Sequence, residues 1–176
     1  GKKVLLACYT FSSPYGVKEV FGFSTPQDID LSNFSITARG ATNAIDAFAT
    51  GVEILEKGGQ ELAQADFITN LVLIGVTDGE DNVSSTTAKA LGKLLEKARK
   101  NENFDSIKSN LIGVRTGQMA EDSKYRGKTV DQVLTEMTQE ATFDQYESAK
   151  NVTDGTYGKI GGFISQSISS ASQGLG

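Results

Sequence analysis

Hydrophobic residues fall in short unbroken runs at three places in this chain. The strongest run covers residues 71–76, and it is apolar at almost every position. Such a run is typical of a central parallel strand that is covered by helices on both faces. Residues 111–114 repeat the pattern, and residues 4–11 form a third apolar run that ends in turn residues. These runs predict three strands, and we expect one or two further short strands within residues 17–23.

Between the runs, apolar residues recur in steps of three and four, which predicts helices. A helix beginning after residues 40–43 is expected to end at Gly58 and Gly59. Two more follow near residues 88–98 and 130–141, and Thr129 with Gln132 has capping-box spacing. We also predict a helix near residues 143–152, a short strand over 156–160 and a last helix over 163–171. The apolar positions of the first three helices are Ile45, Phe48, Val52 and Leu55, then Ala88, Leu91, Leu95 and Ala98, then Val130, Leu134, Met137 and Ala141.

Strands and helices therefore alternate from residue 41 onward. This order predicts an α/β fold with a doubly wound, mostly parallel sheet and helices on both faces, as in Rossmann-like domains. No repeat, low-complexity block or linker interrupts the chain, so residues 1–176 are interpreted as a single domain.

Composition excludes several kinds of chemistry. The chain has no histidine and one cysteine, Cys8, so it has no Ser-His-Asp triad, no histidine-ligated zinc and no internal disulfide. Its formal charge is −5 without a basic cluster, which argues against nucleic acid as a partner. No stretch is long and apolar enough to predict a membrane span. Only oxygen ligands remain for metal binding.

Two residues at expected loop positions are candidate functional residues. Asp78 follows the strongest predicted strand with only Thr77 between them, and Thr42 stands at the start of the first helix. An Asp-Gly turn and a helix cap are the common roles of such residues. The alternative is that their oxygens bind a hard cation, and the negative charge of Glu80 and Asp81 would favour this.

Taken together, these segments resemble the von Willebrand factor type A (vWA) domain. The apolar strand ending in Thr77-Asp78-Gly79 resembles that family's aspartate strand, and residues 40–48 resemble its threonine loop and following helix. Residues 4–13 look like its second strand, and residues 154–157 look like its last strand. The resemblance implies a metal-ion-dependent adhesion site that holds Mg²⁺ or Mn²⁺ through Thr42 and Asp78. It also implies a protein partner whose carboxylate completes the metal's coordination.

The sequence departs from the family in one respect, since no Asp-x-Ser-x-Ser motif follows a strand. Asp30-Leu31-Ser32 holds its first half, but it lies in an expected loop where a turn role is the commoner use. We therefore expect the family's first strand and helix to be missing from this chain, and to be supplied by an upstream segment or by another chain. Direct pairing of the two strands that should flank the missing one would contradict this hypothesis.

Three functions follow from these patterns. The first is a protein-binding module that uses a divalent cation at a partial adhesion site. The second is a metal-free structural or assembly component with the same fold. The third, a phosphotransfer enzyme with Asp78 as nucleophile, is less consistent with the sequence because Asp78-Gly79-Glu80 lacks the Asp-x-Asp pattern of haloacid dehalogenases. We expect a protein that is not an enzyme.

Overall fold

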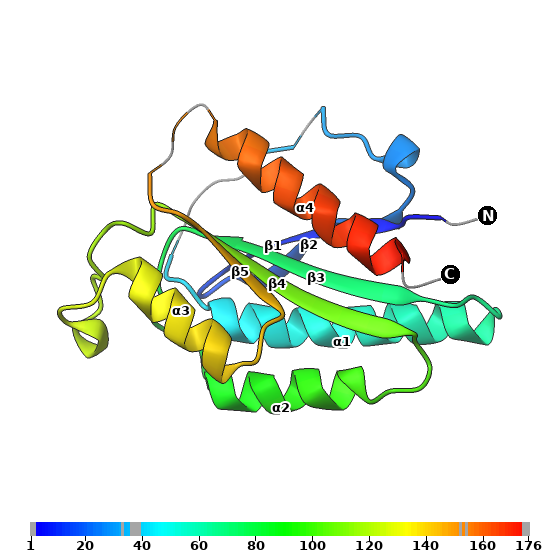
Figure 1. Cartoon of the computed structure of the whole chain (residues 1–176), viewed down its shortest axis with the longest axis horizontal. Helices are drawn as coiled ribbons and strands as arrows, with labels where there is room; N and C mark the ends of the chain where they lie inside the picture. Colours follow the sequence, from blue (N-terminus) through cyan, green and yellow to red (C-terminus); the bar gives the residue numbers. More distant parts are fainter. Residues whose placement is uncertain (1–2, 33, 36–39, 152, 154, 174–176) are drawn as a thin grey trace.

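The computed structural model describes residues 3–32, 34–35, 40–151, 153 and 155–173. Their fold is mixed α/β, with a parallel sheet between helices (Figure 1). The strands are β1 (Leu6–Ser12), β2 (Gly16–Ser24), β3 (Asn70–Thr77), β4 (Ser106–Val114) and β5 (Gln145–Ala149). The α-helices are α1 (Ala44–Gln64), α2 (Ala88–Arg99), α3 (Val130–Glu140) and α4 (Thr156–Gln173), and two short 3₁₀ helices cover Pro26–Asp28 and Ser123–Tyr125.

The five strands form two separate sheets. Strands β3, β4 and β5 pair in parallel in that order, with Leu71 opposite Ile107 and Asn110 opposite Gln145. Strands β1 and β2 form an antiparallel hairpin. Helices α2 and α3 provide the crossovers that parallel neighbours require. The predicted α/β class and the predicted strands at residues 4–11, 71–76 and 111–114 are thus confirmed.

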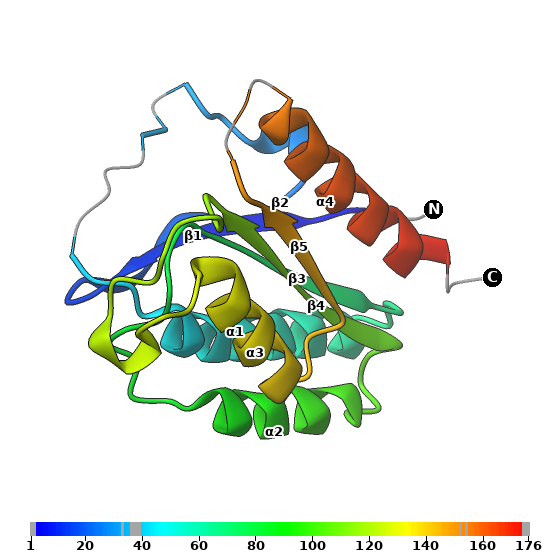
Figure 2. The ribbon, with the colours of Figure 1, turned by 60° about the vertical axis from the view of Figure 1, so that its left-hand side comes forward.

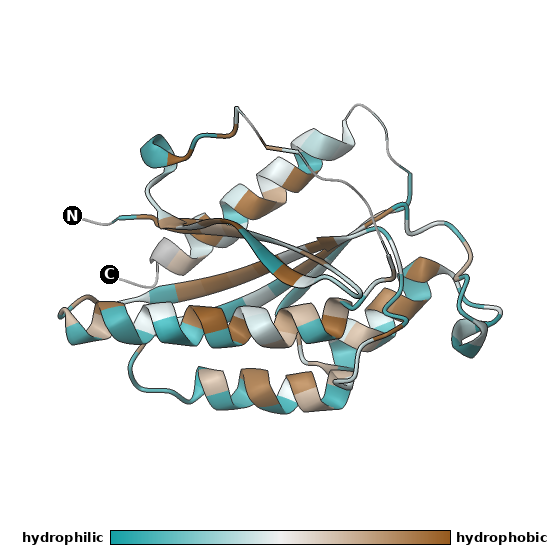
Figure 3. Cartoon of the chain, turned by 180° about the vertical axis from the view of Figure 1, so that it is seen from behind, coloured by the Kyte–Doolittle hydropathy of each residue, from teal (hydrophilic) through white to brown (hydrophobic). Residues whose placement is uncertain are grey.

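Helices lie on both faces of the three-stranded sheet. Helices α1, α2 and α3 lie on one face and α4 lies on the other, as Figures 1 and 2 show. The buried hydrophobic core is on the side of α1, α2 and α3, where Leu91, Leu95, Leu111 and Leu134 are completely buried. Seen from behind, hydrophobic strand segments lie next to α1, whose own surface alternates between hydrophobic and hydrophilic residues (Figure 3).

The first helix is longer than its sequence predicts. It passes through Gly58 and Gly59 and ends at Gln64, so the predicted end at this glycine pair is wrong. Both glycines are close to aromatic rings instead. A Cβ atom on Gly58 would lie 2.7 Å from the Phe23 ring, and one on Gly59 would lie 2.9 Å from the Phe104 ring. The pair permits tight packing inside the helix, and that need outweighs the low helix propensity of glycine.

Two predictions near the C-terminus are also wrong. Residues 143–151 do not form a helix, because Gln145–Ala149 is the edge strand β5, and Val152 lies outside the described residues. Residues 156–160 are not a strand, since they form the first turns of α4. Thr156 marks this start, where its Oγ1 accepts a hydrogen bond from the Thr153 backbone N–H at 2.8 Å. The segment over residues 154–157 is therefore not a strand where the structure describes it, and Asp154 lies outside the described residues.

Strands β1 and β3 belong to different sheets. They run in the same direction in two views (Figures 1 and 2), and both lie against α1. Among the described residues no strand pairing joins them. The direct pairing that would contradict a missing strand is thus not observed, and the hypothesis stays a prediction. No helix in the described part of the chain is long and apolar enough to cross a membrane.

Candidate functional site

The candidate site lies where β3 ends, at the carboxyl edge of the parallel sheet. Open α/β sheets bind ligands at this edge because the loops that leave parallel strands converge there. Asp78 follows β3 directly and is exposed, whereas Thr77 before it is buried. Thr42 lies one residue before Asn43, the N-cap of α1, and it is half-buried.

The hairpin turn is joined to the loop that carries Thr42. Ser13 and Ala41 exchange two backbone hydrogen bonds, of 2.9 and 3.2 Å. Gly40 precedes this bridge with a φ of +72°, and a Cβ atom there would lie 1.8 Å from the Ser13 carbonyl oxygen. Only glycine satisfies both requirements, so Gly40 is needed for the threonine loop to reach the hairpin.

The threonine loop is in turn joined to the loop after β3. The Asn82 backbone N–H donates to the Thr42 carbonyl at 3.1 Å, and the Asn82 Oδ1 accepts from the Thr42 N–H at 3.0 Å. The Thr42 hydroxyl lies 3.6 Å from the position that a Cβ atom on Gly79 would take. The structure therefore places Thr42 next to the Asp78-Gly79 turn, although the two residues lie far apart in the sequence.

Asp81 fastens the same loop to the start of α1. Its Oδ1 accepts from the Ile45 backbone N–H at 3.1 Å and from the Ser84 hydroxyl. The Ser84 Oγ accepts from the Asp46 N–H at 3.0 Å. These bonds satisfy N–H groups that the first turn of a helix leaves free, and Asn43 provides no side-chain cap. A loop distant in sequence thus caps α1.

Asp46 completes the connection from the helix side. Its carboxylate accepts from the backbone N–H groups of Ser85 and Thr86, each at 2.9 Å. Burial acts to raise the pKa of the Asp46 carboxyl, but the hydrogen bonds from Thr86 and Ser85 outweigh it and lower this pKa below its ordinary value. The folded protein therefore stabilises the deprotonated form of the Asp46 side chain.

Glu80 is directed into the protein rather than toward a ligand. Its carboxylate accepts from the backbone N–H groups of Glu121 and Asp122 at 2.7 and 2.8 Å, and only 6% of the residue is exposed. The Asp81 residue is 4% exposed and engaged as described. The sequence suggested that both charges would favour a cation, but backbone N–H groups already compensate them.

Asp78 differs from these two acids because its carboxylate is not engaged by other described residues. It makes no hydrogen bond or ion pair to another described residue, and neither does the Thr42 hydroxyl. Asp78 lines a groove of about 270 Å³. The other residues around this groove come from the ends of β4 and α4: Val114, Arg115, Thr156, Tyr157 and Ile160.

The chemistry of Thr42 and Asp78 fits a hard divalent cation, because both offer oxygen ligands. The two residues are a small set, however. In the part of the chain that the structure describes, no three Asp, Glu or Cys side chains gather in a way that could hold a metal. Any cation there would take most of its ligands from water or from a partner.

Asp30 has a local role. Its Oδ1 accepts from the Ser32 backbone N–H at 2.8 Å, which is the turn interaction that its sequence context predicts. Asn33, the next residue of that pattern, lies outside the described residues. The half-motif at Asp30 shows no described contact with Thr42 or Asp78.

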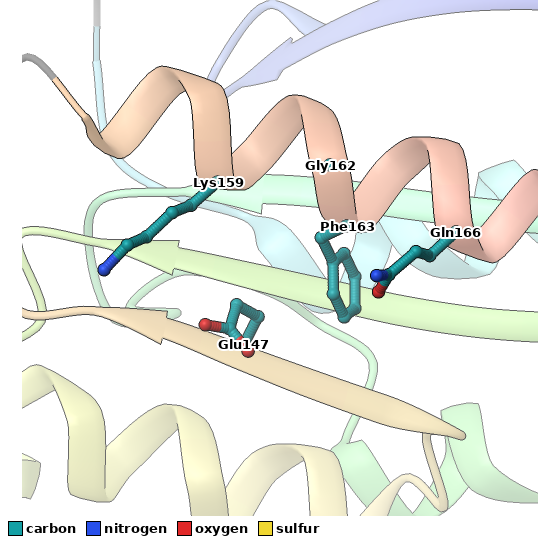
Figure 4. Close-up of a pocket in the computed structure, with 5 residues that line it drawn as sticks. All are labelled: Glu147, Lys159, Gly162, Phe163 and Gln166. Carbon is teal, nitrogen blue, oxygen red and sulfur yellow. The ribbon is translucent and has the colours of Figure 1, made fainter.

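A second groove, of about 300 Å³, lies between α4 and β5 (Figure 4). Glu147 extends toward it from β5, while Lys159, Phe163 and Gln166 extend from α4. Neither Thr42 nor Asp78 lines this groove, so it is separate from the candidate site.

The sequence placed Asn82 in a candidate loop, but it did not point to Ser84 or Asp46 as parts of the site. Their roles consist of hydrogen bonds between the start of α1 and the loop after β3, 36 to 40 residues away. The one available signal was the density of Asp, Asn and Ser residues over 78–85, which is typical of capping side chains.

Comparison with protein-family models, with curated proteins and with solved structures finds no match to this chain.

Proposed function

We propose that this protein is a binding module of the vWA type that holds Mg²⁺ or Mn²⁺ at a partial adhesion site and through it engages a protein partner. In this proposal Thr42 and Asp78 are the metal ligands. The sheet belongs to a doubly wound vWA-like arrangement whose first strand and helix are not among the described elements. The proposal rests above all on the proximity of the Thr42 hydroxyl to the Asp78-Gly79 turn.

The surroundings of the two ligands support this function. Three loops are fastened together at one edge of the sheet through the Ser13–Ala41 and Thr42–Asn82 bonds. Such bonds hold the Thr42 backbone in position before any ligand arrives, which lowers the entropic cost of binding. Asp78 meanwhile keeps its carboxylate exposed. A cation bound there would attract carboxylate groups of a partner and orient them toward this edge.

A metal titration tests the proposal. We expect Mg²⁺ or Mn²⁺ at about 100 times its dissociation constant to stabilise the wild type by about 2.7 kcal/mol. For a chain of this length the melting temperature should rise by roughly 5 to 10 °C. Asp78→Ala should abolish the rise, because it removes the only charged ligand.

Glu121→Ala is the matched control for that titration, since it removes an exposed carboxylate from a neighbouring loop and should leave the rise unchanged. An equal rise in wild type and Asp78→Ala would contradict the assignment of Asp78. The absence of a rise in the wild type would reject the metal-binding function.

The second candidate is a metal-free structural or assembly component with the same fold. One observation favours it: Glu80 and Asp81 serve the internal structure of the site, through bonds to the Glu121, Asp122 and Ile45 N–H groups. A loop with these hydrogen bonds can stabilise the fold without binding a metal. A wild type without any response to Mg²⁺ or Mn²⁺ would favour this candidate over the first.

A strand supplied by an upstream segment or by another chain is part of the same proposal. Strand β3 is strongly apolar, yet most of it is only half-buried and Val76 is 44% exposed. An apolar edge strand without a neighbour invites pairing and aggregation. A parallel strand between β1 and β3 would pair with both and cover α1.

Hydrogen exchange of the chain alone tests this strand. We expect amides of β3 that point away from β4 to exchange much faster than those of β4, which has neighbours on both sides. If an upstream segment or another chain supplies the strand, its presence should protect the same amides. Equal protection of β3 and β4 in the chain alone would argue against an open edge.

A further inference from the structure

The Glu80 side chain connects two loops that are 41 residues apart in the sequence. The carboxylate accepts two backbone N–H bonds, at 2.7 and 2.8 Å from Glu121 and Asp122, and it is shielded from water. Bonds from N–H groups to a shielded carboxylate are strong, and a buried carboxylate that loses them is costly. Glu80 and the loop over residues 118–126 therefore hold one another in place.

A second contact fastens the same loop. The Tyr125 hydroxyl donates to the Asp81 carbonyl oxygen at 3.0 Å. Other described backbone bonds of the loop stay within it or reach residues 115, 128 and 130, as from the Ala120 N–H to the Lys128 carbonyl. Its described attachment to the loop over residues 78–82 thus consists of Glu80 and Tyr125.

We propose that Glu80 is a positioning residue of the cation site, which couples the loop over residues 78–82 to the loop over residues 118–126. The coupling rests on the proposed function, because the cation concerned is the one held by Thr42 and Asp78. Glu80 is two residues from Asp78, and Asp81 is fixed to α1 by the Ile45 N–H. A cation that restrains Asp78 therefore restrains Glu80 and the Glu121 and Asp122 amides bonded to it.

The coupling has two measurable sides, because linkage between two equilibria is reciprocal. Binding of the cation slows local opening of the loop over residues 118–126. Loosening that loop weakens cation binding by the same factor. The partner-binding surface next to the cation then includes this loop, which exposes Met119, Lys124 and Arg126.

Amide hydrogen exchange measured by NMR, with and without Mg²⁺, tests the coupling. In the wild type, Mg²⁺ should slow exchange of the Glu121 and Asp122 amides. In Glu80→Gln these amides should exchange about tenfold faster or more without metal, because a charged acceptor is lost. Mg²⁺ should then no longer slow them, and calorimetry should show weaker Mg²⁺ binding.

Two further variants complete the experiment, one as a control and one as a second way to loosen the loop. Glu102→Gln removes an exposed charge outside both loops and leaves the Glu80 carboxylate in place, and it should behave as the wild type. Tyr125→Phe loosens the loop from its second attachment without changing charge, and it should reduce the Mg²⁺ effect on exchange even if Glu80→Gln does not fold.

The possible failures differ from one another. Mg²⁺ that binds the wild type but leaves the two amides unchanged overturns the coupling and leaves the proposed function standing. Full Mg²⁺ protection retained in Glu80→Gln overturns it as well. If Mg²⁺ does not bind the wild type at all, the proposed function and the coupling both fall.

Discussion

The two faces of the parallel sheet are covered to different extents. On the side of α1, α2 and α3, the hydrophobic side chains of helices and strands form the buried core. Helix α4 covers the opposite face, yet among its described residues the buried ones are polar, Thr156 and Ser167. Its apolar residues Ile160, Phe163 and Ile164 are only half-buried. One face, the closed face, thus has a fully buried hydrophobic core. The other, the α4 face, is only partly enclosed.

Some buried polar groups of the sheet are paired and others are not. On the closed face, Asp144 accepts bonds from the Ser109 N–H at 2.8 Å and from Arg99 at 2.9 Å. On the α4 face, the Nδ2 of Asn70 and the Oδ1 of Asn110 are buried without a hydrogen-bond partner among the described residues. Buried polar groups are normally paired, but the Oδ1 of Asn43 at the start of α1 and the Oγ1 of Thr69 just before β3 also lack a described partner, so unpaired groups are not confined to the α4 face.

The largest effect should come from opening a cavity on the closed face. Leu95→Ala, in α2, should destabilise the protein by about 3 to 5 kcal/mol, because Leu95 is completely buried. Ile164→Ala, at a half-buried position of α4, should cost about 1 to 2 kcal/mol. Urea unfolding followed by circular dichroism measures both values. Equal losses would mean that the two faces contribute alike.

A smaller effect should appear as a change in acid stability. Burial acts to raise the pKa of the Asp144 carboxyl, but the Ser109 N–H bond and the Arg99 guanidinium lower it below its ordinary value. A lowered folded-state pKa stabilises the protein above the ordinary aspartate range, and this stabilisation is lost as the pH falls through the lowered value. Asp144→Asn should therefore lower the melting temperature at pH 7 and make it depend less on pH below about 5.

Asp105→Asn serves as the charge-matched control for that measurement, since Asp105 is exposed. Its acid dependence should match that of the wild type. If Asp144→Asn and the wild type lose stability in parallel from pH 5 to pH 3, Asp144 does not hold the closed face together electrostatically.

Sequence patterns predicted the helices and strands of the closed face more completely than those of the α4 face. The apolar steps of α1, α2 and α3 and the runs of β3 and β4 correspond to elements that the structure contains. Their periodicity is readable because each element buries one continuous apolar surface. The sequence wrongly predicts a helix over β5, because Gln145 and Glu147 are exposed on an edge strand, where pairing with β4 sets the conformation more than composition does.

At the candidate site, the sequence indicated the ligands but not how they are held. Thr42 and Asp78 were selected from their places beside an expected helix and strand, and the structure brings their loops together. The roles of Glu80, Asp81 and Asn82 could not be predicted, because each one depends on a backbone N–H group about 40 residues away. Local patterns contain no information about such pairings.

The sequence by itself determined the α/β class, the main helices and strands, the capping box at Thr129 and the restriction to oxygen ligands. Each of these follows from local periodicity or from composition. Only the tertiary structure decided that α1 continues through Gly58 and Gly59, and that Asp78 alone among the three acids of its loop stays available. Aromatic rings from β2 and from the loop before β4, together with backbone donors from distant loops, produce these outcomes, and their positions are set by tertiary packing.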